Sequence, residues 1–503
     1  MSHSTLLSLN DWHLRAFLHR RIMNDNMDNK NNGNKLSKVL GRTDIIAIGF
    51  GTMVGWSWIM MTTSWVNEAG ILGAVIAFLI GGAIILAIGL VYGELTAALP
   101  LAGGEFAFIY RAMGRNSAWL VGWIMTLAYM GVAAWEGIAL ATAIDYILPI
   151  PKFGPLMEIA GYQVYLSWAL VGVAGALIIT LLNLIGVKSA LLFQVMATAA
   201  LIIIAIVIFL GGVTFGDIDN MGRPFESGRG FFYVLLMVPA MLIGFDIIPQ
   251  SAEEMNIGPK NIGKMIVVCI IISLLWYLIM IIGVGLAAPA EIRFSGIIPM
   301  ADVAAYLFSS QAFSTIIVFG GILGILTTWN GFFIGATRLI YAMGRAWVIP
   351  PVFGRVHRKY KTPWAATLLV GLICVIAPFF GQNALIWFIN TSSLSALISY
   401  CFVIMAFLIL RKKDAGLDRP FRIKGGMVFG RITFAVSIMY LIAYISSEVI
   451  AGGNAPEFII IAAWVVVGAA LAAAAKFKDG HISAEEREIL IFGERLARRG
   501  YGQ

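Results

Sequence analysis

The feature that most constrains this chain is an apolar stretch near its start, residues 43–66, which carries small residues at mid-length. The stretch is long enough to cross a bilayer, which needs about 20 apolar residues. Gly49, Gly51 and Gly55 interrupt it, although each glycine costs a helix about 1 kcal/mol relative to alanine. Irregular backbone at membrane depth is tolerated only where protein or a water-filled cavity satisfies its polar groups. The stretch therefore predicts either a span broken around a binding site or close helix packing through small residues.

A second interrupted stretch, residues 234–255, lies almost half a chain later. It contains Pro239, Gly244 and Pro249, with one acid, Asp246, among them. In a broken span the N–H groups of the second half-helix are free to bind an anion, and carbonyls of the first half can bind a cation. A free amino acid carries both charges. Two such breaks in corresponding spans are typical of secondary transporters with inverted repeats.

The composition indicates a multi-pass membrane protein. Hydrophobic residues make up 60% of the chain and charged residues 12%, whereas soluble domains contain about 25% charged residues. We expect about twelve spans. After 43–66 they are predicted near 71–98, 117–147, 166–186, 190–212, 231–255, 263–288, 311–343, 364–380, 384–410, 428–451 and 456–475.

The distribution of basic residues predicts that both termini are cytoplasmic. With the N-terminus inside, only Lys152, Arg223, Arg229 and Arg293 of the 35 Lys and Arg residues fall in outer loops. An excess of basic residues in the inner loops is the pattern that sets orientation in membranes. The net charge of +8 therefore indicates topology in a lipid bilayer and no nucleic-acid partner. We expect the plasma or cytoplasmic membrane as the location.

No metal site, cofactor or enzymatic motif is expected. Cys269, Cys374 and Cys401 all fall inside apolar spans, which favours buried small hydrophobic residues over a disulfide or metal framework. The sequence contains no HExxH or GxSxG pattern, so an intramembrane enzyme is not favoured. Residues 5–23 suggest a basic amphipathic helix, and 24–34 a linker. Ser483 begins a capping-box pattern for a tail helix expected to reach residue 499.

Five motifs, in order, resemble those of amino acid–polyamine–organocation (APC) permeases. The resemblance covers roughly residues 40–475. The motifs are YGELTAALPLAGGEFAFIYRAMG at 92–114, NLIGVKSALLFQ at 183–194, IGFDIIPQSAEEMNIGPKNIGK at 243–264, NGFFIGATRLIYAMGRAWVIPPVFGRVHRKYKTPWAA at 330–366 and RKKDAGLDRPFRIKG at 411–425.

The resemblance implies an all-α, LeuT-like fold of five plus five inverted-repeat helices with two further helices, and with spans one and six broken. The expected parts are a cytoplasmic arm over 1–42, a first repeat over 43–212, a second repeat over 230–411, two accessory helices over 412–475 and a cytoplasmic tail over 476–503.

The family resemblance also implies where an amino acid would bind. The substrate carboxylate would meet the backbone amides of Gly55, Trp56 and Ser57. The family commonly has Gly–Ser/Thr–Gly here, so Trp56 is a departure that alters the pocket shape, unless the ring only packs or anchors at an interface.

The substrate amine would meet carbonyls beside Met53, Ile243 and Gly244, and Phe245 would line the pocket. Two further positions align with pocket residues of relatives. Trp329 would offer its ring to a cation, and Thr126 would offer a hydroxyl unless it bonds its own helix backbone.

Three residues are candidates for ion coupling. Asp246 is costly to ionise at this depth, while a substrate amine beside it favours the ionised form, so it can exchange a proton for a cation unless it only caps the broken helix. Glu136, in the third span, can attract a cationic substrate, relay protons or pair with a neighbouring helix. Many relatives have a Lys on span five where Leu201 stands. Sodium would instead use span-one carbonyls and the hydroxyl of Thr328.

Three acids at the inner ends of spans, Glu94, Glu253 and Glu254, are predicted to pair with inner-loop Arg and Lys residues and hold a cytoplasmic gate closed. The leading hypothesis is a permease that moves an amino acid by alternating access, coupled to H⁺ or Na⁺ or acting as an exchanger. A polyamine or amine permease, and an amino-acid sensor with little transport, are the alternatives.

Overall fold

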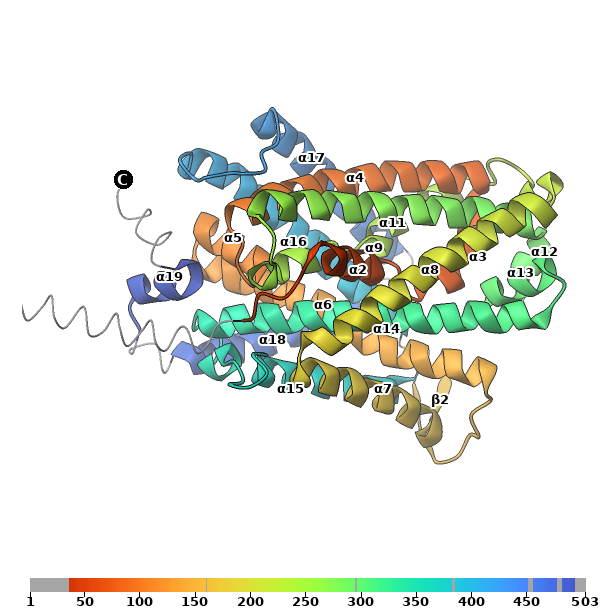
Figure 1. The fold of residues 1–503 in the computed structure, drawn as a ribbon, viewed down its shortest axis with the longest axis horizontal. Helices are drawn as coiled ribbons and strands as arrows, with labels where there is room; N and C mark the ends of the chain where they lie inside the picture. Colours follow the sequence, from red (N-terminus) through yellow and green to blue (C-terminus); the bar gives the residue numbers. More distant parts are fainter. Residues whose placement is uncertain are drawn as a thin grey trace, which may run out of the picture.

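The computed structural model describes residues 36–159, 161–294, 296–381, 385–450, 456–476 and 482–493. The arm helix and linker predicted over 5–23 and 24–34 lie outside these residues. Most of the long helices run close to the long axis of the molecule (Figure 1). The polypeptide therefore forms a bundle whose two ends are built from short helices and loops.

Nine helices in the described residues are long and apolar enough to cross a membrane, and a bent pair makes a tenth candidate span. These nine helices are α4 (Ile71–Ala98), α6 (Arg115–Ile147), α7 (Leu166–Ile185), α8 (Val187–Phe215), α11 (Pro259–Ala287), α14 (Gln311–Arg345), α16 (Leu385–Lys413), α17 (Gly426–Ile450) and α18 (Pro456–Lys476). The structure is thus that of a helical membrane protein. Two shorter apolar helices, α9 (Gly228–Met241) and α15 (Trp364–Ile376), overlap the spans predicted near 231–255 and 364–380.

The first apolar stretch is broken, as its glycines suggested. Helices α2 (Arg42–Met53) and α3 (Ser57–Ala69) are bent by 53° relative to each other. At the break, a Cβ added to Gly55 would lie 2.6 Å from Oγ1 of Thr328 on α14. This close approach requires glycine and fixes the break against α14.

The second interrupted stretch is also irregular. Residues 242–246 separate α9 from the short helix α10 (Ile247–Gln250), and Pro239 removes a backbone donor in the last turn of α9. Gly244 has φ of +124°, and a Cβ there would lie 2.9 Å from the side chain of Thr52 and 3.1 Å from the nitrogen of Met53. The two breaks therefore contact each other inside the bundle.

Short elements cover the two ends of the bundle. A hairpin of β1 (Pro155–Ile159) and β2 (Tyr162–Tyr165) joins α6 to α7; this segment was predicted only as a loop. Its end of the molecule also carries α12 (Ala290–Arg293) and α13 (Pro299–Leu307), whereas α5 (Gly104–Met113) and α19 (Ala484–Phe492) lie at the opposite end (Figure 1). The remaining short elements are η1 (Ile218–Met221), η2 (Ala252–Glu254), η3 (Pro351–Gly354) and η4 (Ala377–Phe380).

The tail helix α19 begins with the capping box that the sequence predicted. The Ser483 hydroxyl accepts from the Glu486 amide at 3.1 Å, and the Glu486 carboxylate accepts from the Ser483 amide at 2.7 Å. The helix packs on the protein, since Arg487 Nε donates to the carbonyl of Ala346 at 3.0 Å. The predicted continuation to residue 499 lies outside the described residues.

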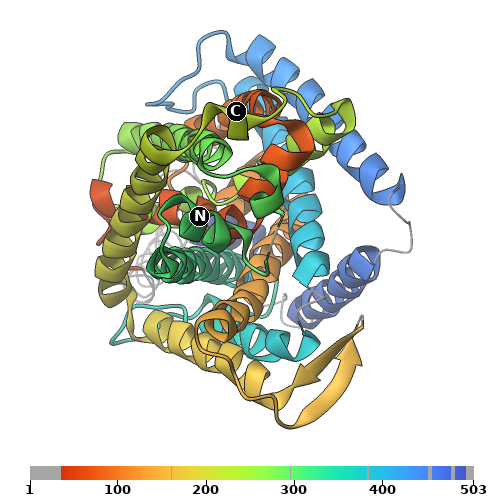
Figure 2. The same ribbon diagram turned by 90° about the vertical axis from the view of Figure 1, so that its right-hand side faces the viewer.

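Helices α17 and α18 lie at the periphery of the bundle (Figure 2). A reciprocal contact attaches α18 to α6: the rings of Trp123 and Trp464 stack with centroids 4.5 Å apart. Each indole N–H donates to the backbone carbonyl of the other tryptophan, at 2.7 and 2.9 Å. The three cysteines are buried and free.

Candidate functional site

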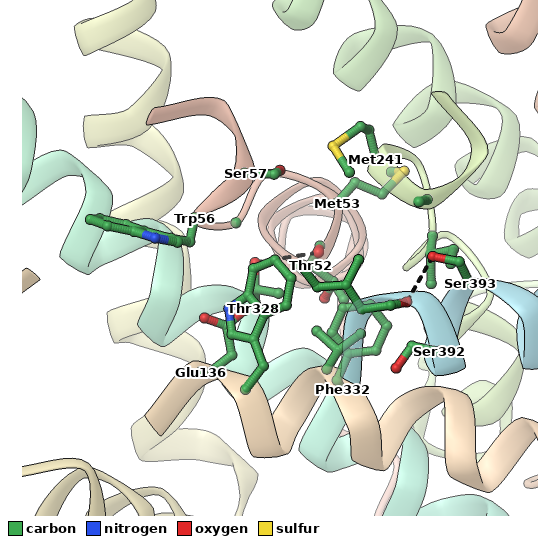
Figure 3. Close-up of a pocket in the computed structure, with 16 residues that line it drawn as sticks. Thr52, Met53, Trp56, Ser57, Glu136, Met241, Thr328, Phe332, Ser392 and Ser393 are labelled. Carbon is green, nitrogen blue, oxygen red and sulfur yellow. Dashed lines mark hydrogen bonds between the residues drawn. The ribbon is translucent and has the colours of Figure 1, made fainter. Parts of the chain in front are cut away.

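A cavity lies where the two breaks meet helices α6, α14 and α16 (Figure 3). The cavity has a volume of about 50 Å³. It is lined by several residues that the sequence singled out. These are Met53, Gly55, Trp56, Ser57, Ile243, Glu136 and Thr328. The cavity thus gathers the first break, part of the second break and one intramembrane acid.

The start of α3 presents backbone donors at this cavity. The first N–H groups of a helix have no carbonyl partner within the helix, and the positive end of the helix dipole lies there. The amides of Gly55, Trp56 and Ser57 form no hydrogen bond within the described residues. This end of α3 is therefore suited to an anionic group such as a carboxylate.

The two tryptophans after the break direct their bulk into neighbouring helices. A Cβ on Gly321 of α14 would lie 2.6 Å from the Trp56 ring. Trp58 makes an edge contact with Trp276 of α11, with centroids 5.6 Å apart. Because a glycine of α14 receives the Trp56 ring, the bulky residue leaves the backbone amides accessible.

Tyr277, on α11, bridges the first break and was not predicted from the sequence. Its hydroxyl donates to the Met53 carbonyl at 3.0 Å and lies 3.3 Å from Ser57 Oγ. It thereby ties the end of α2 to the start of α3. A lone tyrosine within the apolar span 263–288 was the available signal.

Thr328 satisfies carbonyls of the first break. Its hydroxyl lies 3.0 Å from the carbonyl oxygen of Gly51 and 3.3 Å from that of Thr52. This hydroxyl oxygen and these carbonyl oxygens are of the kind expected from the sequence around a sodium ion, and they lie close together.

Several predicted pocket residues lie outside the cavity. The Thr126 hydroxyl donates to the Gly122 carbonyl of its own helix at 2.8 Å. Trp329 is fully buried, and its ring lies where a Cβ on Gly137 or Gly175 would point. These two side chains therefore pack within and between helices.

Gly244 and Phe245 also do not line the cavity. They belong to the second break, beside Asp246. The Phe245 ring packs against Tyr92 and Tyr400, with centroids 5.3 and 5.5 Å apart. Phe245 thus forms an apolar wall next to the carboxyl group that follows it in the chain.

Asp246 is the centre of a buried polar cluster. Its Oδ1 accepts from the Gly244 amide at 2.9 Å, and its Oδ2 accepts from the hydroxyls of Tyr129 at 3.0 Å and Tyr400 at 3.2 Å. No part of the side chain is exposed. Helices α6, α16 and the second break together hold this carboxyl group.

A second buried acid, Glu105 of α5, belongs to the same cluster and was not predicted from the sequence. The Tyr129 hydroxyl that bonds Asp246 also lies 3.3 Å from Glu105 Oε1, and the Gln250 amide contacts both Glu105 and Tyr129. No basic side chain donates to either carboxyl group in the part of the chain that the structure describes. The signal was the acid inside the motif after span two.

Glu136 lies at the cavity beside Trp135. The side chain is 1% exposed, and its Oε2 is buried without a hydrogen-bond partner in the described residues. Among the residues that line the cavity, it is the only one with an ionisable side chain.

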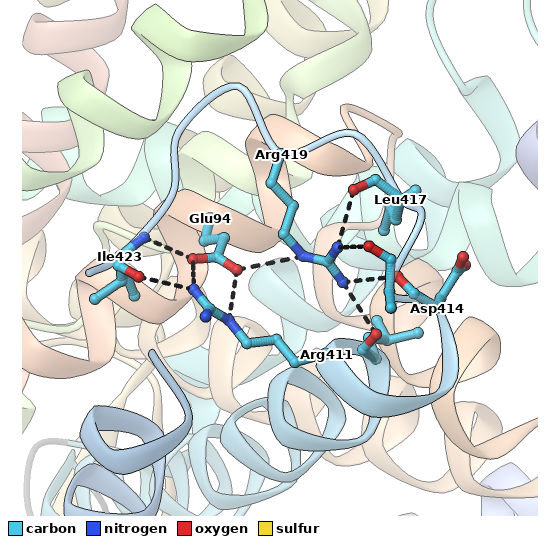
Figure 4. A network of polar contacts seen from close by, with 8 residues as sticks. Glu94, Arg411, Asp414, Leu417, Arg419 and Ile423 are labelled. Atoms are coloured by element: carbon cyan, nitrogen blue, oxygen red, sulfur yellow. Dashed lines mark hydrogen bonds and ion pairs between the residues drawn. The ribbon is translucent and has the colours of Figure 1, made fainter. Parts of the chain in front are cut away.

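The three acids predicted at inner span ends all form ion pairs. Glu94 Oε1 accepts from Arg411 Nε at 2.9 Å, its Oε2 accepts from the Ile423 amide at 2.8 Å, and Arg419 lies 3.4 Å away (Figure 4). The other two acids pair with residues near the end of α14. Glu253 pairs with Arg345 and Glu254 with Arg338, each at 2.7 Å.

A model of the family described as amino acid permease matches residues 40–471. The chain belongs to the amino acid permease family. Its members are transporters and not enzymes, and this permease is a member of the APC superfamily that the motifs indicated.

Three relatives illustrate the range of the family. The methylthioribose transporter of Bacillus subtilis (strain 168) is 23% identical over 444 residues, which cover 86% of this chain and 92% of the relative. The aspartate-proton symporter of the same organism is 27% identical over 414 residues, covering 79% and 77%. The vacuolar cationic amino acid transporter 4 of Arabidopsis thaliana is 26% identical over 400 residues, covering 76% and 65%. Because their names differ in solute, the solute of this permease has to be inferred from its own cavity.

Proposed function

We propose that this permease moves α-amino acids across a membrane by alternating access. The observation that carries the proposal is the row of unpaired amides at the start of α3, which opens on a cavity shared with the second break. A substrate carboxylate binds the amides of Gly55, Trp56 and Ser57. The α-amine binds carbonyls beside Met53 and Ile243, with Gly244 and Phe245 of the second break behind them. Amides and carbonyls at one site match both charges of an amino acid.

The fold proposed with this function is LeuT-like, with twelve spans. Helix α9 with the second break forms span six, and α15 with η4 forms span nine, which adds two spans to the ten candidates. The two repeats extend over 43–212 and 230–411, and two accessory helices follow over 412–475. We place both termini in the cytoplasm and the protein in the plasma or cytoplasmic membrane, because basic residues are concentrated on one side.

The coupling ion proposed is the proton, carried by Asp246. Besides the Gly244 amide, its hydrogen-bond partners are two hydroxyls, which can donate to a carboxylate or accept from a protonated carboxyl group. Sodium is the alternative ion, for which the Thr328 hydroxyl and the carbonyls of Gly51 and Thr52 would supply oxygen ligands. A relative named as an aspartate-proton symporter fits this choice.

The ion pairs of Glu94, Glu253 and Glu254 are proposed to hold the inner gate closed. Both oxygens of Glu254 contact the Arg338 guanidinium, and both of Glu253 contact that of Arg345. Paired contacts of this geometry are the strong form of an ion pair. Opening toward the cytoplasm would have to separate α14 from the segment after the second break.

An amine permease is the second candidate, because the cavity contains the acid Glu136. Uptake into proteoliposomes of a labelled amino-acid panel plus putrescine, with imposed proton, sodium or counter-substrate gradients, separates the two. Accumulation of α-amino acids driven by a proton gradient supports the proposal. Accumulation of putrescine without any α-amino acid contradicts it.

One substitution tests the carboxylate site directly. Ser57 is the first residue of α3, and proline at this position removes the backbone N–H. Ser57→Pro should weaken uptake of α-amino acids, whereas Ser57→Ala keeps the amide and serves as its control. Equal affinities of the two variants would show that the carboxylate binds elsewhere.

A further inference from the structure

The cavity contains one feature that recognition of an amino acid's backbone does not use. The proposed carboxylate and amine partners are all backbone groups of the two breaks. Glu136 comes from a different element, α6, and lies on the side of the cavity near Thr328 (Figure 3). Its carboxyl group therefore remains available after both backbone charges of a substrate are bound.

A buried acid without a basic partner among the described residues carries a cost that a substrate can remove. Glu136 is buried, and one of its oxygens has no partner in the described residues. A buried acceptor without a partner is destabilising, and a buried charge without a counterion more so. A zwitterionic substrate leaves the cavity with a net negative charge, whereas a substrate with one additional cation makes the total neutral.

We propose that Glu136 binds the side-chain cation of the substrate, and that this permease prefers basic amino acids. The inference rests on the proposed function, because it needs the carboxylate and amine of the same molecule to be held at the breaks. Trp135 and Phe332 also line the cavity, and their rings provide surfaces that attract a cation. The acid supplies the charge and the rings supply the apolar walls for the side-chain stem.

The charge of the substrate side chain is the variable to test. Arginine and citrulline are close in shape but differ in charge, and lysine and norleucine form a second such pair. Uptake of each is measured in proteoliposomes containing the full-length protein, and the ratio of kcat/KM within each pair is compared. We expect the wild type to favour the charged member about tenfold or more, the range for a hydrogen bond to a charged group.

The Glu136→Gln variant should lower arginine uptake about tenfold and leave citrulline uptake unchanged or raised, so that the ratio approaches one. Glu136→Asp keeps the charge and should retain the preference for arginine. Glu457→Gln is the matched control. Glu457 is also a buried glutamate with one unpartnered oxygen, but it lies on α18 outside the cavity, and its variant should keep the wild-type ratio.

Three results would overturn the inference. One is that the wild-type protein does not prefer the charged member of either pair. Binding measurements on the purified wild type test this preference even if Glu136→Gln fails to fold. Another is an unchanged ratio in Glu136→Gln. Uptake restricted to neutral amino acids also overturns it but leaves the proposed function standing, whereas uptake of diamines without any α-amino acid overturns both.

Discussion

Replacing Asp246 by asparagine separates coupling from binding. Asparagine has the same shape but cannot exchange a proton. The Gly244 amide, 2.9 Å from Oδ1, keeps its acceptor. The Tyr129 and Tyr400 hydroxyls, at 3.0 and 3.2 Å from Oδ2, can rotate to accept from the new amide, because a hydroxyl both donates and accepts. We therefore expect a loss of unfolding free energy of about 1 kcal/mol, the value of one hydrogen bond.

The effect on transport should be much larger. A pH difference of one unit is worth about 1.4 kcal/mol per proton, so that one coupled proton supports at most about tenfold accumulation. Asp246→Asn should accumulate substrate no further than the external concentration, while exchange of labelled for unlabelled substrate continues. Both rates are measured in proteoliposomes, with and without an imposed pH gradient. Accumulation that still follows the pH gradient in the variant would refute the role of Asp246.

Three further predictions concern the breaks and the ion pairs. Gly55→Ala should lower the free energy of unfolding by about 1–3 kcal/mol, because its Cβ would lie 2.6 Å from a side-chain oxygen of α14. Thermal unfolding in detergent measures this loss. Gly258→Ala is the control and should leave the stability unchanged, because no atom lies within 4 Å of a Cβ at that position. Tyr277→Phe removes the hydroxyl that joins the two half-helices and should weaken substrate binding severalfold, as equilibrium binding would show; unchanged affinity would mean that the break is held by other contacts. Glu94→Gln removes the ion pair with the Arg411 guanidinium and should weaken the proposed inner gate. A cysteine placed in the cavity at position 392 should then react with a thiol reagent severalfold faster. An unaltered rate would argue against the inner gate.

The position of the breaks could be predicted from sequence because glycine and proline act locally. Gly55 and Pro239 disturb a helix whatever surrounds them. The same holds for the capping box at Ser483, which depends on residues three apart. Residues of this kind determine the conformation of the backbone next to them. The structure contains the breaks and the capping box at the predicted positions.

Which residues line the cavity could not be predicted from the sequence in the same way. Along α6, each residue is rotated by about 100° from the one before it. An alignment error of one residue therefore assigns the pocket position to a side chain that faces another direction. Thr126 was predicted to face the pocket, but Val132, Trp135 and Glu136 are the α6 residues that do. Contacts between segments far apart in the chain, such as Glu105 with Tyr129, have no local signature at all.

The reciprocal tryptophan contact couples the peripheral helix α18 to α6, which lines the cavity. Because each ring bonds the backbone of the other helix, α18 cannot slide along α6 without losing both bonds. Any tilt of α6, which carries Tyr129 and Glu136, is thus transmitted to a helix that faces outward. A spectroscopic label on the exposed side of α18, for example at Val466, would follow the transport cycle from outside without touching the cavity.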